Sequence, residues 1–253
     1  LCTCDTQLSL LAEMARQLPA DYPSLRLASP AQLSNHASVD LYTEQVLQHA
    51  KVILISVHGG VSYWRYGIER LVELGERGVQ VIMVPGCDNP DPELLALSTV
   101  PAADAERLWQ FLRQGGAVNA QQLFNCIASQ WLQRAYPWLA PQALPRVGVY
   151  HPQQTTASLA DWQASWQIGA PVVALLFYRT QVQAANTGFI DVFCQRLQAQ
   201  GLNPLPIALA SLKEAACLAQ VEDWLDEARC TLIINTTAFA LSNPEAPSAR
   251  PFR

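Results

Sequence analysis

Apolar runs of strand length alternate with amphipathic helical patterns in the first part of the chain. The runs at 51–57 (KVILISV) and 79–86 (VQVIMVPG) are continuous and rich in β-branched residues. Such runs are typical of parallel strands that are covered on both faces. Apolar residues at helical spacing precede and separate them, at 5–18, 37–50 and 63–78. This alternation predicts a parallel sheet with right-handed crossovers.

Shorter signals refine this first unit. Residues 1–4 (LCTC) are typical of the end of a strand, and 24–29 (SLRLAS) predicts a short strand. Asp5 is the expected N-cap of the first helix, because its carboxylate can accept a hydrogen bond from the first-turn amides. Gly78 is expected to end the helix that begins near residue 63.

The pattern changes after Pro90, and no strand is expected up to Leu139. Three helical segments are predicted there, and the aromatic residues on their apolar faces are expected in the core: Trp109, Phe111, Phe124 and Trp131. A proline-rich stretch, PWLAPQALP at 137–145, is typical of a linker.

A second β-α-β-α-β pattern begins at Pro171, after a short strand predicted at 146–152. Its strands are expected at 171–179, 203–211 and 230–237, and its helices at 186–201 and 217–228. The fold class is therefore α/β, with two Rossmann- or flavodoxin-like parallel-sheet units separated by a helical segment. The predicted domains are an N-terminal α/β unit at 1–89, the helical segment and linker at 90–145, and a truncated second α/β unit at 146–253.

Composition narrows the class of protein. The chain has 253 residues, of which 50% are hydrophobic, so a sizeable core can form. The net charge is −5 and the 16 basic residues are scattered, which argues against a nucleic-acid surface. No apolar run reaches the ~18 residues that a membrane span needs, and no signal peptide is visible. We therefore expect a cytoplasmic protein, and the start at Leu1 suggests a piece of a longer one.

Seven cysteines occur at irregular spacing: Cys2, Cys4, Cys87, Cys126, Cys194, Cys217 and Cys230. Buried, reduced thiols are the favoured interpretation, since the number is odd and the setting is expected to be cytosolic. The pair Cys2 and Cys4 could bind a metal, but a C-x-C motif without a second pair is a weak signal, and no metal site is predicted.

The phosphate-binding motifs of nucleotide enzymes are absent from the sequence. It has no G-x-x-x-x-G-K-[ST] loop and no G-x-G-x-x-G after a strand, so ATP is not expected to bind here. The carboxylates of Asp88, Asp91 and Glu93 lie close together, but interleaved prolines favour a solvated turn over a binding site.

The stretch HGGVSYW at 58–64 joins a predicted central strand to a helix, at the end of the sheet where open α/β folds bind ligands. Gly59 and Gly60 would let the backbone approach a ligand, Tyr63 and Trp64 could stack on a flat ring, and His58 could donate, accept or ligate. The alternative carries more weight: the glycines only form the turn, and the aromatic residues pack the helix.

The second unit repeats this geometry at 177–187 (FYRTQVQAANT). Tyr178 and Arg179 end a strand, and a polar loop leads to a helix start at Asn186 and Thr187. Arginine pairs with carboxylates, and a helix N-terminus favours anions. A solvent-facing arginine beside a capped helix is an equal alternative.

These same residues carry a resemblance to a known family. The stretch at 171–213 resembles the strand, helix and "PLPIF"-like strand of the CobN/magnesium chelatase H subunit family, and INTTAFAL at 234–241 resembles its "N-x-T-x-F-A" strand end. Segments typical of the cobaltochelatase branch lie further upstream, at 23–42, 59–67, 90–100 and 144–152. His58 departs from the aliphatic residue expected before the two glycines.

The resemblance implies an N-terminal fragment of the large, tetrapyrrole-binding subunit of an ATP-dependent cobaltochelatase. Such enzymes insert Co²⁺ into hydrogenobyrinic acid a,c-diamide in aerobic cobalamin biosynthesis. The implied partners are AAA+ ATPase subunits, which use ATP with Mg²⁺, and the corrinoid substrate. The fragment alone is expected to be inactive, with the catalytic groups downstream of Arg253, since its four histidines form no cluster at ligand spacing: His36, His49, His58 and His151.

Two other functions stay open at this point. The chain could be a non-catalytic α/β scaffold that docks the AAA+ subunits, or an unrelated flavodoxin-like binder of small molecules. The substrate-binding residues expected from both loops are Gly59, Gly60, Tyr63, Trp64, Tyr178, Arg179, Asn186 and Thr187.

Overall fold

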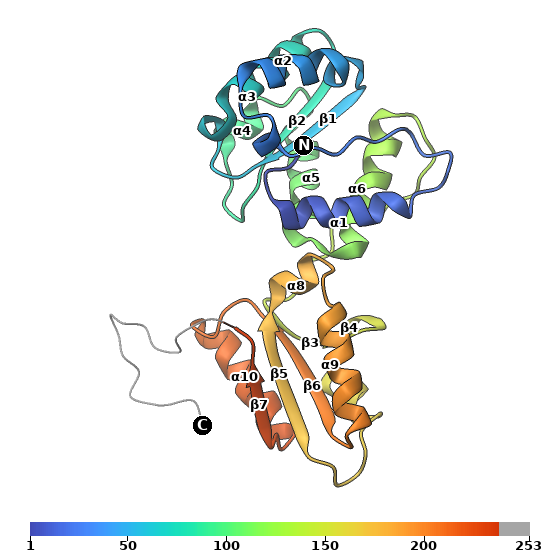
Figure 1. The fold of residues 1–253 in the computed structure, drawn as a ribbon, viewed down its shortest axis with the longest axis vertical. Helices are drawn as coiled ribbons and strands as arrows, with labels where there is room; N and C mark the ends of the chain where they lie inside the picture. The colour runs from blue at the N-terminus through green and yellow to red at the C-terminus, as the bar shows by residue number, and fades with distance from the viewer. Residues whose placement is uncertain (238–253) are drawn as a thin grey trace. The chain divides into compact units, whose positions relative to one another are not determined.

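The computed structural model describes residues 1–237 and forms two compact units, Leu1–Ala143 and Leu144–Arg253 (Figure 1). Side chains are described at all of these residues except 155 and 156. The helical segment predicted at 90–145 lies in the first unit up to Ala143, because its apolar faces pack on the first sheet. Within the described residues, no helix is both long and apolar enough to cross a membrane.

The first unit is built on two parallel strands, β1 (Val52–Val57) and β2 (Gln80–Pro85), paired from Val52 with Gln80 to Val57 with Pro85. Both strands were predicted from their apolar runs. The chain start extends the sheet beyond β1: the Leu1 amino group donates to the Leu54 carbonyl at 2.7 Å, and Cys2 bridges Ser56. The strand end predicted at 1–4 is therefore present only as a single bridge and not as a strand.

The strand predicted at 24–29 does not form. That segment lies outside any strand, although the Cys2 amide donates to the Ala28 carbonyl at 3.1 Å. A strand requires a repeated ladder of such bonds, which alternating apolar residues alone do not supply.

The helices around this sheet (Figure 1) are α1 (Asp5–Arg16), α2 (His36–Gln45), α3 (Arg65–Glu76), α4 (Pro92–Ala96), α5 (Ala102–Gln114) and α6 (Gly116–Trp131). Successive side chains of β2 point to opposite faces. Ile82 and Val84 therefore join the core formed with α1, α5 and α6, while Val81 and Met83 join the core formed with α2, α3 and α4. Burial on both faces explains the continuous apolar run.

The aromatic residues of the helical segment lie where the sequence predicted. Trp109, Phe111 and Phe124 are buried in the core of α1, α5 and α6, and Trp131 packs against it. Asp5 is not the N-cap of α1: Cys4 holds that position, and Asp5 is the first helical residue. Its carboxylate can still favour the helix start through the helix dipole.

The outer edge of β2 is covered by hydroxyl groups instead of a third strand. Thr99 Oγ1 accepts from the Val81 amide at 2.8 Å, and Ser98 Oγ accepts from the Met83 amide at 2.9 Å. The Ser98 hydroxyl also donates to the Met83 carbonyl, and the Thr99 hydroxyl donates to the Val81 carbonyl, both at 3.3 Å. Satisfying these backbone groups ends the sheet at β2 and protects the edge from pairing with another chain.

Replacing Thr99 with valine is expected to lower the free energy of unfolding by about 1–2 kcal/mol, because the Val81 amide loses its partner. Thr99→Ser keeps the hydroxyl and should cost well under half as much. Urea denaturation followed by circular dichroism measures both. An equal loss in the two variants would show that the methyl group, not the hydroxyl, stabilises this edge.

The described part of the second unit holds a five-stranded sheet in the order β4-β3-β6-β5-β7. Its strands are β3 (Val147–His151), β4 (Gln154–Ala157), β5 (Val172–Tyr178), β6 (Asn203–Leu209) and β7 (Leu232–Asn235). β5 pairs in parallel with β6 and β7, as predicted. β3 runs antiparallel to both β6 and β4, so the sheet is mixed where the sequence predicted a parallel one.

Two prolines lie inside the buried strand β6, a position that proline normally avoids. The Asn203 amide donates toward β5, to the Pro171 carbonyl at 2.9 Å. Backbone N–H groups alternate between the two edges of a strand, so the backbone nitrogens of Pro204 and Pro206 lie on the edge away from β5. On that side β3 pairs only with residues 207–209 of β6. The missing N–H groups therefore fall where no strand requires them, and Trp166 Nε1 instead donates to the Pro204 carbonyl at 3.0 Å.

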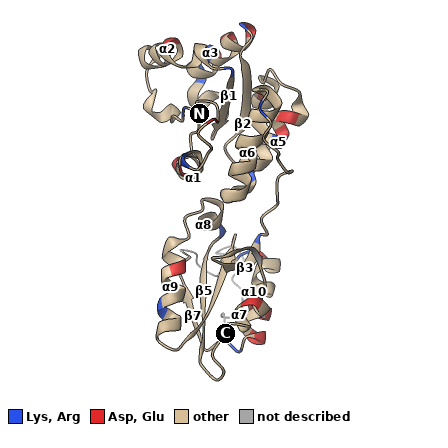
Figure 2. Cartoon of the chain, turned by 90° about the vertical axis from the view of Figure 1, so that its right-hand side faces the viewer, with Lys and Arg blue, Asp and Glu red and all other residues tan. Residues whose placement is uncertain are grey.

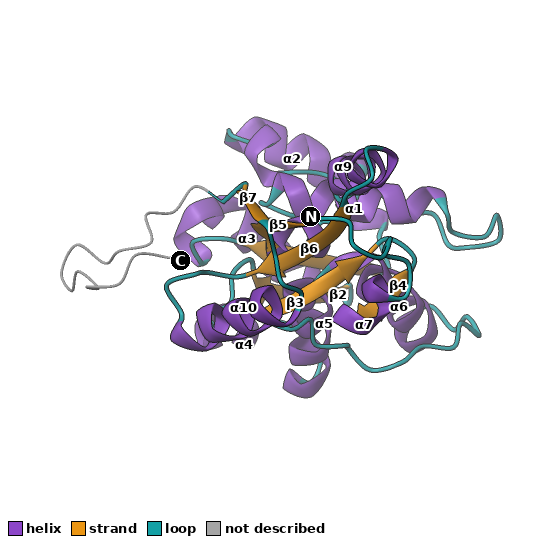
Figure 3. Cartoon of the chain, turned by 90° about the horizontal axis from the view of Figure 1, so that it is seen from below, coloured by secondary structure: helices purple, strands orange, loops and turns teal. Residues whose placement is uncertain are grey.

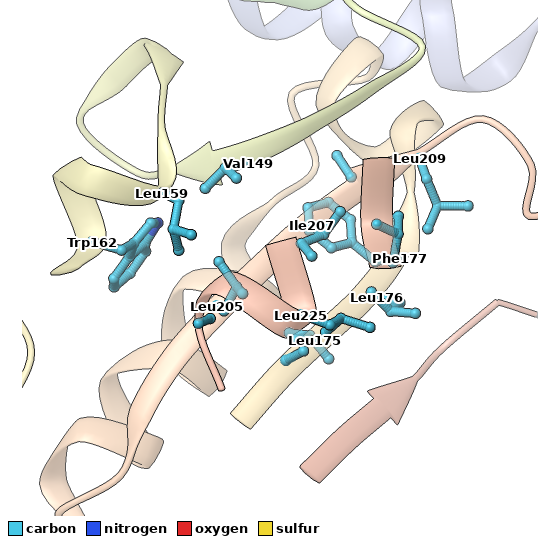
Figure 4. Close-up of a cluster of buried hydrophobic side chains, with 14 of the residues drawn as sticks. Val149, Leu159, Trp162, Leu175, Leu176, Phe177, Leu205, Ile207, Leu209 and Leu225 are labelled. Carbon is cyan, nitrogen blue, oxygen red and sulfur yellow. The ribbon is translucent and has the colours of Figure 1, made fainter. Parts of the chain in front are cut away.

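The helices of the second unit are α7 (Leu159–Gln163), α8 (Arg179–Gln183), α9 (Gly188–Ala199) and α10 (Ala215–Glu227). α9 and α10 cover opposite faces of the sheet (Figures 2 and 3). Between them lies a core of aliphatic side chains around Phe177, Leu175 and Ile207, with Trp162 and Leu159 of α7 at its margin (Figure 4). The short helix α8 replaces the first part of the loop predicted after Tyr178.

Candidate functional site

The turn after β1 forms because Gly59 and Gly60 adopt left-handed backbone angles, with φ of 92° and 70°. L-residues with a side chain rarely adopt these angles. A Cβ at Gly60 would also lie 3.1 Å from Asp91 Oδ2. The neighbouring His58 is exposed, and its backbone amide donates to Thr3 Oγ1 at 2.8 Å. The local structure thus requires both glycines, whether or not a ligand approaches them.

Trp64 is not available to stack on a ligand. Its side chain is only 8% exposed, and its Nε1 donates to the Leu33 carbonyl at 3.1 Å. The indole lies directly on Gly67 of α3, where a Cβ would stand 2.2 Å from the ring. The prediction that Trp64 contacts substrate is therefore corrected: the indole anchors the start of α3 in the core.

Tyr63, next to it, is the aromatic residue of this turn that faces solvent. Its side chain is 52% exposed and lies over Gly59, where an added Cβ would stand 3.5 Å from the Tyr63 Cβ, an ordinary van der Waals distance. An exposed phenol beside two glycines can stack on a flat ring and offer a hydroxyl. Tyr63, Gly59 and Gly60 therefore form the part of the first predicted loop that a ligand can reach.

In the second unit, Tyr178 and Arg179 lie at the carboxyl end of β5 and are both half-buried. Arg179 begins α8, and its Nη2 donates to the Leu144 carbonyl at 3.0 Å. This bond orients the guanidinium, which has five N–H donors in all. The arginine is thus held at the strand end and is not a freely moving surface side chain.

The start of α9 is fixed by a tyrosine that the sequence did not single out. Thr187 is the N-cap residue, but its side chain caps no backbone amide. The Tyr150 hydroxyl instead lies 2.8 Å from Thr187 Oγ1 and 2.8 Å from Asp191 Oδ1. A carboxylate only accepts, so the phenol donates to Asp191 and bonds the Thr187 hydroxyl as well. Asn186 is exposed beside this group.

Burial raises the pKa of Tyr150 to about 12; the Thr187 hydroxyl opposes this shift and the Asp191 carboxylate adds to it. An unfolded tyrosine titrates near pH 10. The hydrogen-bonded phenol therefore stabilises the fold fully below about pH 10, and this contribution is lost as the pH rises toward 12.

Tyr150→Phe should lower the free energy of unfolding by about 1–2 kcal/mol at neutral pH, because two hydrogen bonds are lost. The difference between the wild type and Tyr150→Phe should then shrink above pH 10. Urea titrations at several pH values measure this difference. Curves that stay parallel up to pH 12 would contradict the raised pKa.

The sheet topology adds residues that sequence reasoning missed. The chain runs from β5 through α9 to β6 on one side, and returns through α10 to β7 on the other. Ligands of open α/β folds bind beside the carboxyl ends of the strands where the order reverses, which here means β5 and β7. The end of β7 places Asn235 beside Leu176 of β5. Asn235 Oδ1 accepts from the amide and hydroxyl of Thr237 at 2.9 and 2.7 Å.

The polar end of β7 was visible in the sequence as INTT at 234–237, but only the topology places it next to β5. The remainder of the family-like stretch at 238–241 lies outside the described residues. Two strand ends with phenol, guanidinium, amide and hydroxyl groups can bind carboxylates and amides through hydrogen bonds.

The other candidate clusters have structural roles. Asp91 caps α4 by accepting from the Leu94 amide at 3.0 Å, and Asp88 lies 3.5 Å from Arg113. Cys2 is buried, and its Sγ lies 2.9 Å from Gln7 Oε1. All seven cysteines belong to the described part of the chain and are free thiols. Across that part, no three His, Cys, Asp or Glu side chains gather as a metal-ligand set.

Comparisons with known proteins agree on one family. The family model for CobN/Magnesium Chelatase matches residues 109–251. The chain is 67% identical over its whole length to the aerobic cobaltochelatase subunit CobN of Pseudomonas aeruginosa, and 33% identical over 97% of its length to that of a Sinorhizobium species. It spans 20% of each relative, about a fifth of their length.

A solved structure shows the same fold. The catalytic subunit of cobaltochelatase from Mycobacterium tuberculosis superimposes with a TM-score of 0.65 at 26% identity, covering 87% of this chain and 17% of that one. The resemblance seen in the strand-loop-helix stretches is thereby confirmed. This chain belongs to the CobN/magnesium chelatase family.

Proposed function

We propose that the chain is part of the large subunit of an aerobic cobaltochelatase, which inserts Co²⁺ into hydrogenobyrinic acid a,c-diamide during cobalamin biosynthesis. The observation that carries this proposal is the 67% identity to a cobaltochelatase subunit across the entire chain. The structural similarity to a cobaltochelatase catalytic subunit also supports the proposal. The runner-up is a scaffold that docks the ATPase subunits without touching substrate.

Within that subunit, we assign this chain to binding the corrinoid and not to the metal chemistry. Metal insertion requires a base for the pyrrole protons, ligands for Co²⁺ and a water-poor cavity. The described residues offer no converging ligand set, and the histidines His36, His49, His58 and His151 lie on separate elements. We therefore propose that the base and the metal ligands lie outside the described residues, downstream of Arg253.

The proposed partners are AAA+ ATPase subunits that hydrolyse ATP with Mg²⁺, since this sequence has no phosphate-binding loop of its own. The proposed location is the cytoplasm, where seven free thiols stay reduced. Energy from ATP would reach the corrinoid through contacts between subunits.

The proposed substrate contacts are those that the structure leaves accessible. In the first unit they are Tyr63, Gly59 and Gly60. In the second they lie at the strand ends and at the start of α9: Tyr178, Arg179, Asn186 and Thr187. The corrinoid presents several carboxylates around a flat conjugated ring. An oriented guanidinium suits the carboxylates and an exposed phenol suits the ring.

Arg179→Ala is expected to weaken corrinoid binding by about 1.5–3 kcal/mol, the range for a hydrogen bond to a charged group. Arg179→Lys should restore only part of the affinity, because an ammonium cannot form the bidentate pair. Absorbance titration with the a,c-diamide measures both. Because Arg179 also bonds the Leu144 carbonyl, circular dichroism must show an intact fold. Unchanged affinity in both variants would remove Arg179 from the site.

A chimera tests the proposed function itself. The matching fifth of the Pseudomonas relative is replaced by these 253 residues, and Co²⁺ insertion is measured with the ATPase subunits present. The chimera should keep activity within about tenfold of the relative, whereas a subunit lacking this region should have none. Loss of activity in a folded chimera would overturn the proposal. Full corrinoid affinity after deletion of the region would favour the scaffold.

A further inference from the structure

The first two turns of α9 carry exposed apolar side chains where a helix covering a sheet normally has polar ones. The later exposed residues of the helix are polar, among them Gln195, Arg196 and Gln198. Phe189, Val192 and Phe193 are 49%, 55% and 36% exposed. Their spacing of three and four residues places them on one face of the helix. Ile190 and Cys194, on another face, are buried against the sheet. We call Phe189, Val192 and Phe193 the α9 patch.

Helix α10 lies on the opposite side of the same sheet (Figures 2 and 3) and provides a comparison within this unit. Its exposed residues are alanines in the first turns and acidic residues after them: Ala215, Ala216, Ala219, Glu222, Asp223, Asp226 and Glu227. Both helices have comparable lengths and both are buried on the inner side by the same core. The apolar outer residues of α9 are therefore a property of that helix and not of the unit as a whole.

We propose that the α9 patch is covered by another segment of the same large subunit, one that lies outside residues 1–253. This inference rests on the proposed function, because it requires the longer polypeptide. The two curated relatives are each about five times as long as the chain, which spans 20% of their length. Most of the subunit is therefore available as the occupant.

The size of the patch favours a tethered occupant over a second copy of the chain. A phenylalanine has roughly 200 Å² of side-chain surface, so the exposed parts of the three residues amount to on the order of 250 Å². A stable interface between separate proteins buries about 800 Å² on each partner. A segment on the same polypeptide has a high effective concentration and needs far less area.

Burying the patch would also complete the layering of the unit. The first two turns of α9 are apolar on both their inner and outer faces, which is typical of a helix segment inside a larger assembly. The covering segment should present aliphatic or aromatic side chains toward α9 and leave the acidic face of α10 in solvent. The α9 side of the sheet would then lie in the interior of the large subunit, and the α10 side would lie at its surface.

Photo-crosslinking in the full-length chimera tests this assignment. The photoreactive residue p-benzoylphenylalanine replaces Val192, and in the control it replaces Asp226 on α10. Irradiation at low protein concentration should crosslink position 192 to a peptide outside residues 1–253 of the same chain, identified by mass spectrometry. Position 226 should give roughly a tenth of that yield or less, as expected for a solvated site.

Each other result would overturn the proposal. A crosslinked product of doubled mass that disappears on dilution would identify a second copy, and one that requires added ATPase subunits would identify a partner. Crosslinking that corrinoid abolishes would point to the ligand, and no crosslinking at all would leave the patch in solvent. Cobaltochelatase activity of the unsubstituted chimera is measured separately, so failure of the proposed function is recognised independently.

Val192→Asp provides a second readout. In the full-length chimera it should speed limited proteolysis by about tenfold, because a charge at the patch opens the contact and proteolysis follows the open population. In the 253-residue chain alone the same change should leave the proteolysis rate within about twofold, since Val192 is exposed there. Equal rates for variant and wild type in the chimera would contradict the proposed contact.

Discussion

Trp64→Ala is expected to lower the free energy of unfolding of the first unit by about 3–5 kcal/mol, the range for removing a buried tryptophan or phenylalanine. The indole is 8% exposed, lies on Gly67 and donates to the Leu33 carbonyl. The substitution would leave a cavity between the turn and α3 and an unpaired carbonyl. Urea denaturation monitored by circular dichroism measures the loss.

Tyr63→Ala is the matched control, because it removes the adjacent aromatic ring from the surface. With 52% of its side chain exposed, Tyr63 should contribute within about 0.5 kcal/mol of zero. In corrinoid titrations of the full-length chimera, Tyr63→Ala should weaken binding more than Trp64→Ala does, since Tyr63 is the accessible ring. Equal stability losses for the two variants would refute the separation of a structural from an accessible aromatic residue.

Asn203→Ala should lower the free energy of unfolding of the second unit by about 2–4 kcal/mol, because three hydrogen bonds of a buried amide are lost together. Asn203 is 5% exposed at the start of β6. Its Oδ1 accepts from the Gln167 amide at 2.9 Å, and its Nδ2 donates to the carbonyls of Gln167 and Ala170 at 2.9 and 3.2 Å. These bonds tie the link before β5 to β6.

Asn203→Asp sharpens this test because it keeps the acceptor and the volume but removes both donors. A carboxylate facing two carbonyl oxygens should destabilise the unit at least as much as alanine does. Asn186→Ala, at an exposed asparagine of the same unit, should change stability by no more than about 0.5 kcal/mol. Denaturant titrations compare the three variants. A mild effect of Asn203→Asp would show that packing, not hydrogen bonding, holds the link.

The accuracy of the sequence predictions depended on whether a feature was local. β1, β2 and β5 could be predicted from continuous apolar runs. A strand that is buried on both faces requires such a run, regardless of which strand it pairs with. The segment at 24–29 has only alternating apolar residues and no ladder partner, so it does not become a strand. The direction of β3 could not be predicted either, because the spacing of apolar residues is the same in parallel and antiparallel strands.

The candidate site shows the same division. Two glycines after a strand predicted a tight turn, and both adopt left-handed angles there. Adjacent aromatic residues gave no sign of which one is buried, because that depends on the close approach of Trp64 to Gly67. Tyr150 has no local signal either: it reaches Thr187 and Asp191 only because β3 lies in the same sheet as the strands around α9.

The α/β class, the order of the main helices and strands, the turn glycines and the family could all be predicted from the sequence, because each is encoded in residue types over short stretches. Three-dimensional contacts were needed to show that Trp64 is buried, that Tyr63 is exposed and that β3 is antiparallel. The same holds for Asn235 beside β5 and for the exposed apolar face of α9. These features depend on contacts between residues that are distant in the chain, and a local sequence pattern does not specify such contacts.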